Sequence, residues 1–284
     1  MRLGHGQFLG RYQASRQVDG RALAELRPVV PEHEVEPHAH DDAHLLLLLD
    51  GDYVSSAQGM PALCRAPALV LNPPGTVHRD RFRGLDGRFF TVSWPAQRWR
   101  AALGQRSLPL HPQRLGATAV ARAFALWREL RHWDTASTLA VQSGFESLLD
   151  EATLDTRLAS GAGPAWLERA RECLADEWRA TPDLAALARI ADVHPVYLAR
   201  AFRRRYGCSP AAYLRRCRMA RAIELLHGTR LRLAAIAARC GYADQSHFTH
   251  AFRRAHRCTP SQYREWTAGR RQVPNLQGGA ARPC

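Results

Sequence analysis

The sequence predicts an α+β protein of more than one domain, with a β-rich N-terminal half and an all-α C-terminal half. Three observations lead to this prediction. Short apolar runs broken by Pro, Gly and Asp fill residues 1 to about 110, helical periodicity begins near Leu115, and an internal repeat occupies the C-terminal half. The 284 residues exceed one compact domain, and the 46% apolar content supports a folded core.

Composition excludes several classes of protein. The longest aliphatic run, Leu45–Leu49, is far shorter than the ~20 residues that span a bilayer, and the first residues lack the apolar stretch of a secretory signal. The seven cysteines include no C-x-x-C pair, which favours reduced thiols over a disulfide framework or a zinc-cysteine site. We therefore expect a cytoplasmic protein.

The N-terminal strands are predicted from the runs AHLLLLLDGDY, APALVLNPPGTVH and GRFFTVSWP, whose spacing suits a β-barrel or sandwich over residues 1–112. Residues 113–155 follow with two amphipathic helices, the second from about Ser137 to Leu154. Their large side chains favour a dimer interface, although the same faces could instead close the barrel. Those side chains are Phe124, Trp127, Trp133 and Phe145.

The remaining chain divides into three segments. Residues 156–164 contain the small residues of a linker, residues 165–268 are helical, and residues 269–284 are rich in Gly, Pro and Arg, as in a disordered tail.

The two halves of the chain differ sharply in net charge. Residues 1–163 carry 18 Arg against 17 acidic residues, net +1, whereas the rest carries 22 Arg against 9, net +13. Such an excess is typical of a domain that binds a polyanion, most often nucleic acid.

A repeat with a register of fifty residues lies in the basic half. The pattern AFRR, three residues, C-S/T-P, two residues, Y starts at Ala201 and again at Ala251. Each copy predicts a helix, a tight turn and a second helix, at about residues 184–205 and 233–254. His194-Pro195 and Asp244 mark the starts of the two second helices. The sequence therefore predicts two helix-turn-helix units.

Helical phasing separates a core face from an outward face in each second helix. Leu198 and Phe202 share one side in the first copy, as Phe248 and Phe252 do in the second. The other side is small, polar and basic, as suits a helix that enters a major groove. The candidate DNA-binding residues are Val196, Ala199, Arg200, Arg203, Arg204, Gln245, Ser246, Thr249, His250, Arg253 and Arg254.

The segment from Asp183 to Trp266 resembles the DNA-binding domain of the AraC/XylS family of bacterial transcription regulators. The most specific stretch is IAARCGYADQSHFTHAFRR (residues 236–254), continued by TPSQYR (residues 259–264). The resemblance implies double-stranded promoter DNA and RNA polymerase as partners, a homodimer, and a long helix joining the two units at about residues 210–226. It also implies a bacterial protein on the nucleoid when bound to DNA. Two departures are His194, where the family has Ser or Thr, and His250, where it often has arginine.

The N-terminal half resembles the paired motifs of cupin barrels, which implies a jelly-roll fold. The first motif contains His38, His40 and His44, and the second ends at His78. Metal-bearing cupins usually have glutamate where His44 stands, and an Asn where Phe82 stands. The four histidines are candidates for a metal-free effector pocket, and a purely structural cluster is a further alternative. No cofactor is expected, but a divalent transition metal is possible because imidazoles suit such ions.

Three function classes remain open: a sequence-specific transcription regulator that responds to a small molecule through a sensory cupin, a metal-dependent cupin enzyme fused to a DNA-binding module, and an architectural DNA binder without an effector. No acid/base dyad, nucleophile triad or P-loop stands out, so no catalytic residue is predicted and we do not expect an enzyme. Turnover of a small molecule would favour the second class, and binding without sequence preference would favour the third.

Overall fold

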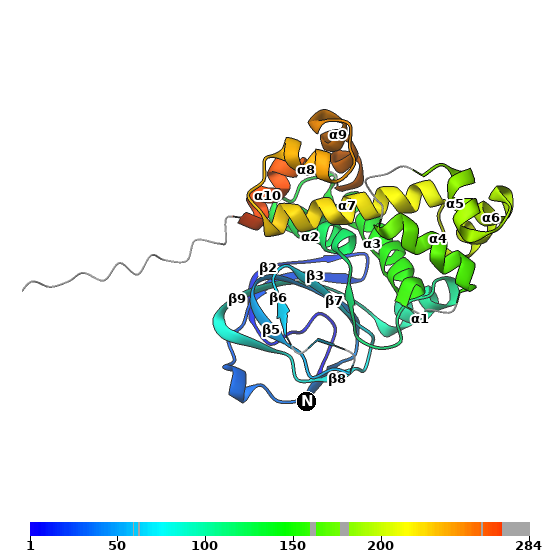
Figure 1. The fold of residues 1–284 in the computed structure, drawn as a ribbon. Helices are drawn as coiled ribbons and strands as arrows, with labels where there is room; N and C mark the ends of the chain where they lie inside the picture. Colours follow the sequence, from blue (N-terminus) through cyan, green and yellow to red (C-terminus); the bar gives the residue numbers. More distant parts are fainter. Residues whose placement is uncertain (59, 62, 160–162, 177–181, 257, 269–284) are drawn as a thin grey trace, which may run out of the picture.

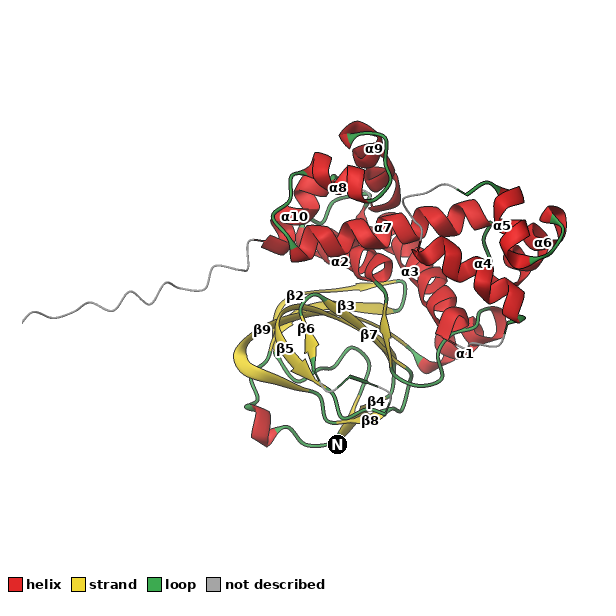
Figure 2. Ribbon diagram, viewed as in Figure 1, coloured by secondary structure: helices red, strands yellow, loops and turns green. Residues whose placement is uncertain are grey.

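The computed structural model describes residues 1–284 except 59, 62, 160–162, 177–181, 257 and 269–284. A β-barrel forms the N-terminal part, two long helices lie across it, and the C-terminal helices pack on the other side of that pair (Figures 1 and 2). This arrangement confirms the predicted α+β class. The disordered tail expected over residues 269–284 lies outside the described residues.

The barrel contains two sheets. One has the order β10-β7-β5-β9-β3-β2, with β6 paired to β5, and the other has the order β1-β4-β8. The β1–β4 pair is parallel and the other described pairs are antiparallel. The strands are β1 (Arg2–Leu3), β2 (Arg11–Val18), β3 (Arg21–Arg27), β4 (His38–His40), β5 (Ala43–Val54), β6 (Cys64–Arg65), β7 (Ala68–Asn72), β8 (Val77–His78), β9 (Arg81–Trp94) and β10 (Gln113–Leu115), with a short 3₁₀ helix at Glu32–Glu34.

The leucine run in β5 is buried along its whole length because the sheet is covered on both faces. Leu46 and Leu48 belong to the apolar cluster inside the barrel. Leu45, Leu47 and Leu49 alternate to the outer face and join the cluster that includes the helices. A strand covered on both sides reads as an unbroken apolar run, and this explains why the run does not alternate. His44 shares the inward parity of Leu46, which points it into the barrel.

Three helices connect the barrel to the C-terminal part: α1 (Ala96–Gln105), α2 (Ala117–Arg131) and α3 (Ser137–Ala159). The sequence reasoning did not predict α1. Two boundaries also differ from expectation. Residues 113–115 pair with β7 as part of the barrel sheet, and α3 continues four residues into the segment expected to be a linker. Gly144 lets α2 and α3 approach closely, since a Cβ there would lie 2.8 Å from the Leu126 Cδ2 atom.

The aromatic side chains of α2 and α3 are buried within this chain. Phe145 packs edge-on against Trp94 of the barrel, with ring centroids 4.8 Å apart. The Trp127 Nε1 donates a hydrogen bond to the buried Glu25 carboxylate at 2.8 Å, and Phe124 contacts a ring of the last helix. These side chains close the core, which is the alternative named above, so their bulk gives no support to a dimer interface.

The C-terminal helices form two packed units that share one long helix. The first unit has its own apolar cluster, which includes Leu154 from the end of α3. The second belongs to the same cluster as the barrel and α2. The helices are α4 (Ala165–Asp176), α5 (Leu184–Ala191), α6 (Pro195–Tyr206), α7 (Pro210–Gly228), α8 (Leu233–Arg239), α9 (Gln245–His256) and α10 (Pro260–Ala268). Among the described residues, no helix is long and apolar enough to cross a membrane, and the six described cysteines form no disulfide with one another.

Candidate nucleic-acid interface and histidine cavity

The first helix-turn-helix unit is α5, a three-residue turn and α6. Asp183 caps α5, its side chain accepting from the Ala186 N–H at 2.6 Å. Asp192 ends that helix in the left-handed region, at φ 56°. His194 caps α6 despite departing from the family residue, because its Nδ1 accepts from the Val196 N–H at 3.3 Å.

The second unit is α8, a turn containing Gly241 at φ 74°, and α9. Asp244 caps α9, accepting from the His247 N–H at 2.7 Å, which confirms the predicted helix start. The next helix, α10, begins with a reciprocal cap: Thr259 accepts from the Gln262 N–H, and the Gln262 side chain accepts from the Thr259 N–H. These local bonds fix the start of α9 and the start of the helix that follows it.

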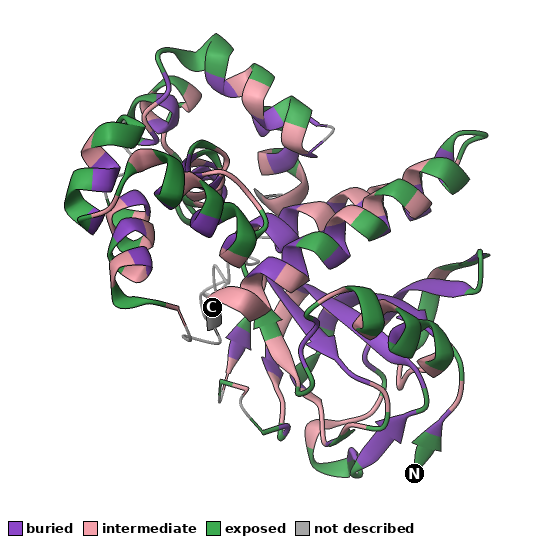
Figure 3. Cartoon of the chain, turned by 90° about the vertical axis from the view of Figure 1, so that its right-hand side faces the viewer, coloured by how far each residue is buried: buried purple, intermediate pink, exposed green. Residues whose placement is uncertain are grey.

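The outward faces of α6 and α9 are exposed while their inward faces are fully buried (Figure 3). Leu198, Phe202, Phe248 and Phe252 each have 0% exposure. Of the candidate DNA-binding residues, Ala199 and Thr249 are half-buried, and the other nine are exposed. Those nine are Val196, Arg200, Arg203, Arg204, Gln245, Ser246, His250, Arg253 and Arg254.

The arginines on these faces are available to bind an anion. Within the described residues, Arg200, Arg203, Arg253 and Arg254 form no ion pair with an acidic side chain. The sequence reasoning missed Tyr197, which is 53% exposed at the start of α6 and packs against Trp166 of α4 at 5.4 Å. An exposed aromatic next to a basic helix face was the signal that could have identified it.

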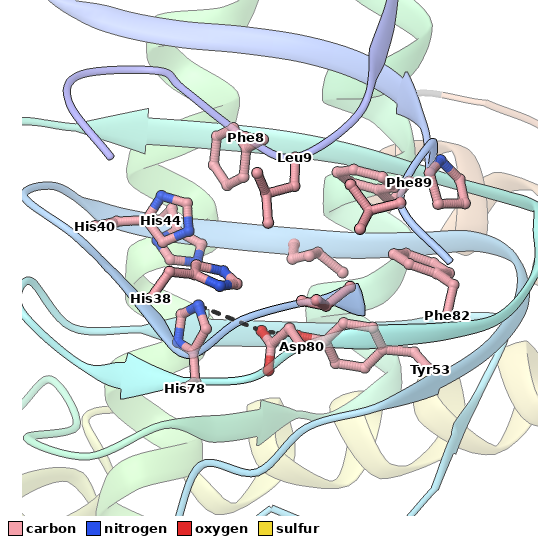
Figure 4. Close-up of a pocket in the computed structure, with 14 residues that line it drawn as sticks. Phe8, Leu9, His38, His40, His44, Tyr53, His78, Asp80, Phe82 and Phe89 are labelled. Carbon is pink, nitrogen blue, oxygen red and sulfur yellow. Dashed lines mark hydrogen bonds and ion pairs between the residues drawn. The ribbon is translucent and has the colours of Figure 1, made fainter. Parts of the chain in front are cut away.

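The four predicted histidines converge inside the barrel (Figure 4). His38 and His40 lie on β4, and β8 pairs with β4 in the register that sets His78 opposite His38. His44 is the second residue of β5, and its ring centroid lies 4.3 Å from that of His40. One ring nitrogen from each of His38, His40 and His78 lies within 4.8 Å of the other two, and all four side chains are buried.

His44 is set apart from the other three by a hydrogen bond. Its Nε2 lies 2.9 Å from the buried Asn72 amide nitrogen, the residue opposite it on β7. That amide donates and the ring accepts, so this nitrogen is not available to a ligand. The structure therefore brings together the four histidines that the sequence singled out, but only three of them present nitrogens to one point.

Three further side chains complete the cavity and were not predicted. Asp80 is buried beside the cluster, with its Oδ2 3.6 Å from the His78 Nε2, and the Tyr53 hydroxyl donates a hydrogen bond to it. Phe8, from the loop after β1, covers His40 at 4.8 Å between ring centroids. Metal-bearing cupins usually have a glutamate where this chain has His44. Asp80 supplies a carboxylate near the histidines in its place. Its position, two residues after His78 in the sequence, was a signal that could have identified Asp80 as a residue of the cavity.

Burial keeps His40, His44 and His78 neutral. Desolvation, followed by the neighbouring histidines, lowers the pKa of His40 to about 3, and desolvation followed by His38 does the same for His78. The pKa of His44 is also held well below its usual range, mainly by burial. Burial raises the pKa of the Asp80 carboxyl, against the hydrogen bonds that it accepts. Neutral imidazoles keep the lone pairs that ligate transition metals.

The cavity is small. Its volume is about 40 Å³, which is room for an ion with one or two water molecules rather than for a metabolite. The buried Nδ1 of His78 has no hydrogen-bond partner among the described residues. Three buried and converging imidazoles are a donor set that zinc, nickel, copper or iron accepts. The residues present therefore fit a divalent transition metal.

Two family models match this chain. One, described as an AraC-like ligand binding domain, matches residues 27–153, and the other, described as a helix-turn-helix domain, matches residues 187–265. Comparison with curated proteins gives no match.

Solved structures show similarity to either the C-terminal half or most of the chain. The C-terminal domain of AraT, a response regulator from Geobacillus stearothermophilus, is 31% identical over 41% of this chain and 94% of that one, with a TM-score of 0.36. A DNA-binding transcriptional dual regulator from Escherichia coli K-12 is 27% identical over 39% and 98%, with a TM-score of 0.36. ToxT from Vibrio cholerae O395 is 13% identical over 81% and 90%, with a TM-score of 0.38.

Proposed function

Because this chain belongs to the AraC family of transcription regulators, with a ligand-binding domain before its DNA-binding domain, we propose that α6 and α9 recognise a specific sequence in double-stranded promoter DNA. The observation that carries this proposal is the exposure pattern repeated in α6 and α9. Each helix buries two large side chains and turns a polar, basic face outward. A helix of that kind fits the major groove and contacts base edges from its outward face.

The long helix α7 supports the use of both units on one DNA molecule. Its 19 residues span about 28 Å at ~1.5 Å per residue. That length is close to the ~34 Å of one DNA turn, the usual separation of two recognition helices on one face of the duplex. One chain would therefore contact two neighbouring segments of the major groove.

Selection of bound duplexes from a random pool tests this proposal. We expect enrichment of a site with two short conserved segments about one helical turn apart. Enrichment of no sequence, with an affinity that depends on salt alone, would identify an architectural DNA binder instead.

We propose that the histidine cavity is the sensory site, so that the ligand bound in it acts as the effector. The small volume and the three converging imidazoles favour a divalent transition metal over a metabolite. His38, His40 and His78 would hold the ion, and Asp80 lies where it can orient His78. When bound, the ion would connect the ligands on β4 to the ligand on β8. Its role would be structural and not catalytic. A larger effector requires that Phe8 and Leu9, which line the cavity, move away.

Elemental analysis of the full chain, purified without an affinity tag, distinguishes these effectors. We expect one equivalent of metal, lost in His40→Gln and retained in His33→Gln, which changes an exposed histidine outside the cavity. Absence of metal together with a co-purifying organic compound would identify a metal-free effector pocket. Neither result depends on DNA binding.

A further inference from the structure

A second, larger hollow lies outside the barrel. It is a groove of about 590 Å³ between α2, α3 and the C-terminal end of α9, the helix labelled at the top of Figure 1. Its walls come from the ligand-binding domain on one side and from a recognition helix on the other. The volume falls in the range of small-molecule sites, about 300–1,000 Å³.

His256, the last residue of α9, lines this groove with two unsatisfied nitrogens. The side chain is 2% exposed, and neither Nδ1 nor Nε2 has a hydrogen-bond partner among the described residues. The internal repeat provides a comparison. Tyr206 holds the equivalent position in the first copy, and its hydroxyl donates to Glu168 at 2.8 Å. A buried polar group without a partner is rare and points to a missing ligand or water.

Charge and apolar surface in the groove define what could bind. Arg122 lies against α9: its Nη1 donates to the Ala255 carbonyl oxygen at 3.5 Å, while its Nε pairs with the buried Glu151 carboxylate at 3.1 Å. Arg254 lines the same end of the groove. Glu129, the acidic residue of the lining, pairs with Arg128 at 3.7 Å. Arg254 is therefore the lining cation that has no acidic partner among the described residues. The remaining wall is apolar or small, with Leu126 and the exposed Leu139 on it.

We propose that this groove binds a small amphipathic anion, with its charged group near Arg122, Arg254 and His256 and its apolar body along Leu126 and Leu139. The neutral imidazole of His256 supplies one N–H donor to the anionic group. Because the ligand contacts α2, α3 and α9 at once, it ties the second recognition helix to the ligand-binding domain. This site is distinct from the histidine cavity and goes beyond the function proposed above.

Fluorescence titration of the full chain with 8-anilinonaphthalene-1-sulfonate tests the site, because the probe is an apolar fluorophore with one sulfonate. We expect one saturable site per chain. Ser143→Phe, which places a large side chain on the wall of the groove, should weaken binding at least tenfold, as should His256→Phe. Thr138→Phe is the matched control: it lies exposed on the same helix, away from the lining, and should change affinity less than twofold.

The uncharged analogue N-phenyl-1-naphthylamine tests the anion requirement, and it should bind at least tenfold more weakly. The proposal is overturned if the wild-type chain shows no saturable site, if Ser143→Phe binds the sulfonate as the wild type does, or if the two probes bind equally. Unchanged binding by His256→Phe would overturn the role given to the imidazole. The titration contains no DNA, so its failure leaves the proposed DNA recognition untouched.

Discussion

Arg200 and His250 occupy equivalent positions of the two repeats, fifty residues apart, and both are exposed. A guanidinium pairs with guanine through two hydrogen bonds, whereas an imidazole makes a single contact. The equivalent positions 203 and 253, in contrast, are arginine in both copies. The same residue type is what we expect at positions where both units contact a phosphate. We therefore expect the two recognition helices to hold the backbone alike and to specify different bases.

Arg200→Ala should reduce affinity for the selected DNA site by about 1–3 kcal/mol and relax the preference at one base pair, because a bidentate contact to a base is lost. The measurement is competitive binding to the selected site and to its single-base variants. Arg189→Ala, an exposed arginine of α5, removes the same charge and should leave the base preference unchanged. An equal loss on every sequence after Arg200→Ala would instead make Arg200 a phosphate contact.

Among the helices, α3 links the ligand-binding domain to the DNA-binding domain through a buried carboxylate. The Glu151 side chain, 6% exposed, accepts hydrogen bonds from Arg122 of α2 and from Arg216 of α7. Asp155, one turn later on α3, accepts from the Gly116 N–H at 2.9 Å and so holds the start of α2. One face of α3 thus fixes α2 and the helix that separates the two recognition helices.

Glu151→Gln should lower the free energy of unfolding by about 2–3 kcal/mol, because two partly buried arginines lose their shared counter-charge. Urea unfolding followed by tryptophan fluorescence measures this change. Glu146→Gln makes the same substitution on the same helix, where the side chain is 49% exposed, and should cost less than about 1 kcal/mol. Equal effects of the two variants would show that Glu151 does not join the domains.

At the scale of the whole molecule, the second DNA-binding unit is continuous with the barrel. One apolar cluster extends from the outer face of the barrel sheet through α2 and α3 to α8, α9 and α10. The first unit instead packs around a separate cluster with α4 and the end of α3. We therefore expect a change in the barrel to affect the second recognition helix through packed side chains, whereas the first unit meets the ligand-binding domain at the end of α3.

Stability should fall as the pH drops below 6.5, because folding keeps several histidines neutral. His40, His78 and His256 have their pKa lowered to about 3, and His44 well below its usual value, so the unfolded chain binds more protons in this range. Each such group is neutral in both states well above pH 6.5, so it adds no pH-dependent term there, and it costs on the order of 1 kcal/mol of stability by pH 5.5.

Urea midpoints at pH 7.5 and 5.5, measured with a chelator present, test this dependence. The wild-type midpoint should be lower at pH 5.5. His256→Phe should show a smaller drop, because it removes one of these groups, whereas the exposed His33→Gln should show the wild-type drop. A midpoint that stays constant or rises at pH 5.5 would contradict the prediction.

The sequence by itself determined the features that depend on local order along the chain. Alternation and periodicity separate the strands from the helices, the fifty-residue repeat predicts both helix-turn-helix units, and phasing places Arg200 and His250 on outward faces. The strand pattern likewise predicts that His38, His40, His44 and His78 gather in the barrel, where the structure has them.

Only the tertiary structure decided which side chains meet across the fold. Asp80 reaches the histidines, and Asn72 removes His44 from their donor set, because strand pairing brings distant residues into register. The aromatic faces of α2 and α3 are apolar whether they cover a barrel or a second chain, so only their packing shows that Trp127 belongs to this core. Periodicity specifies that a face is buried, whereas the partner that buries it depends on contacts between segments far apart in the sequence.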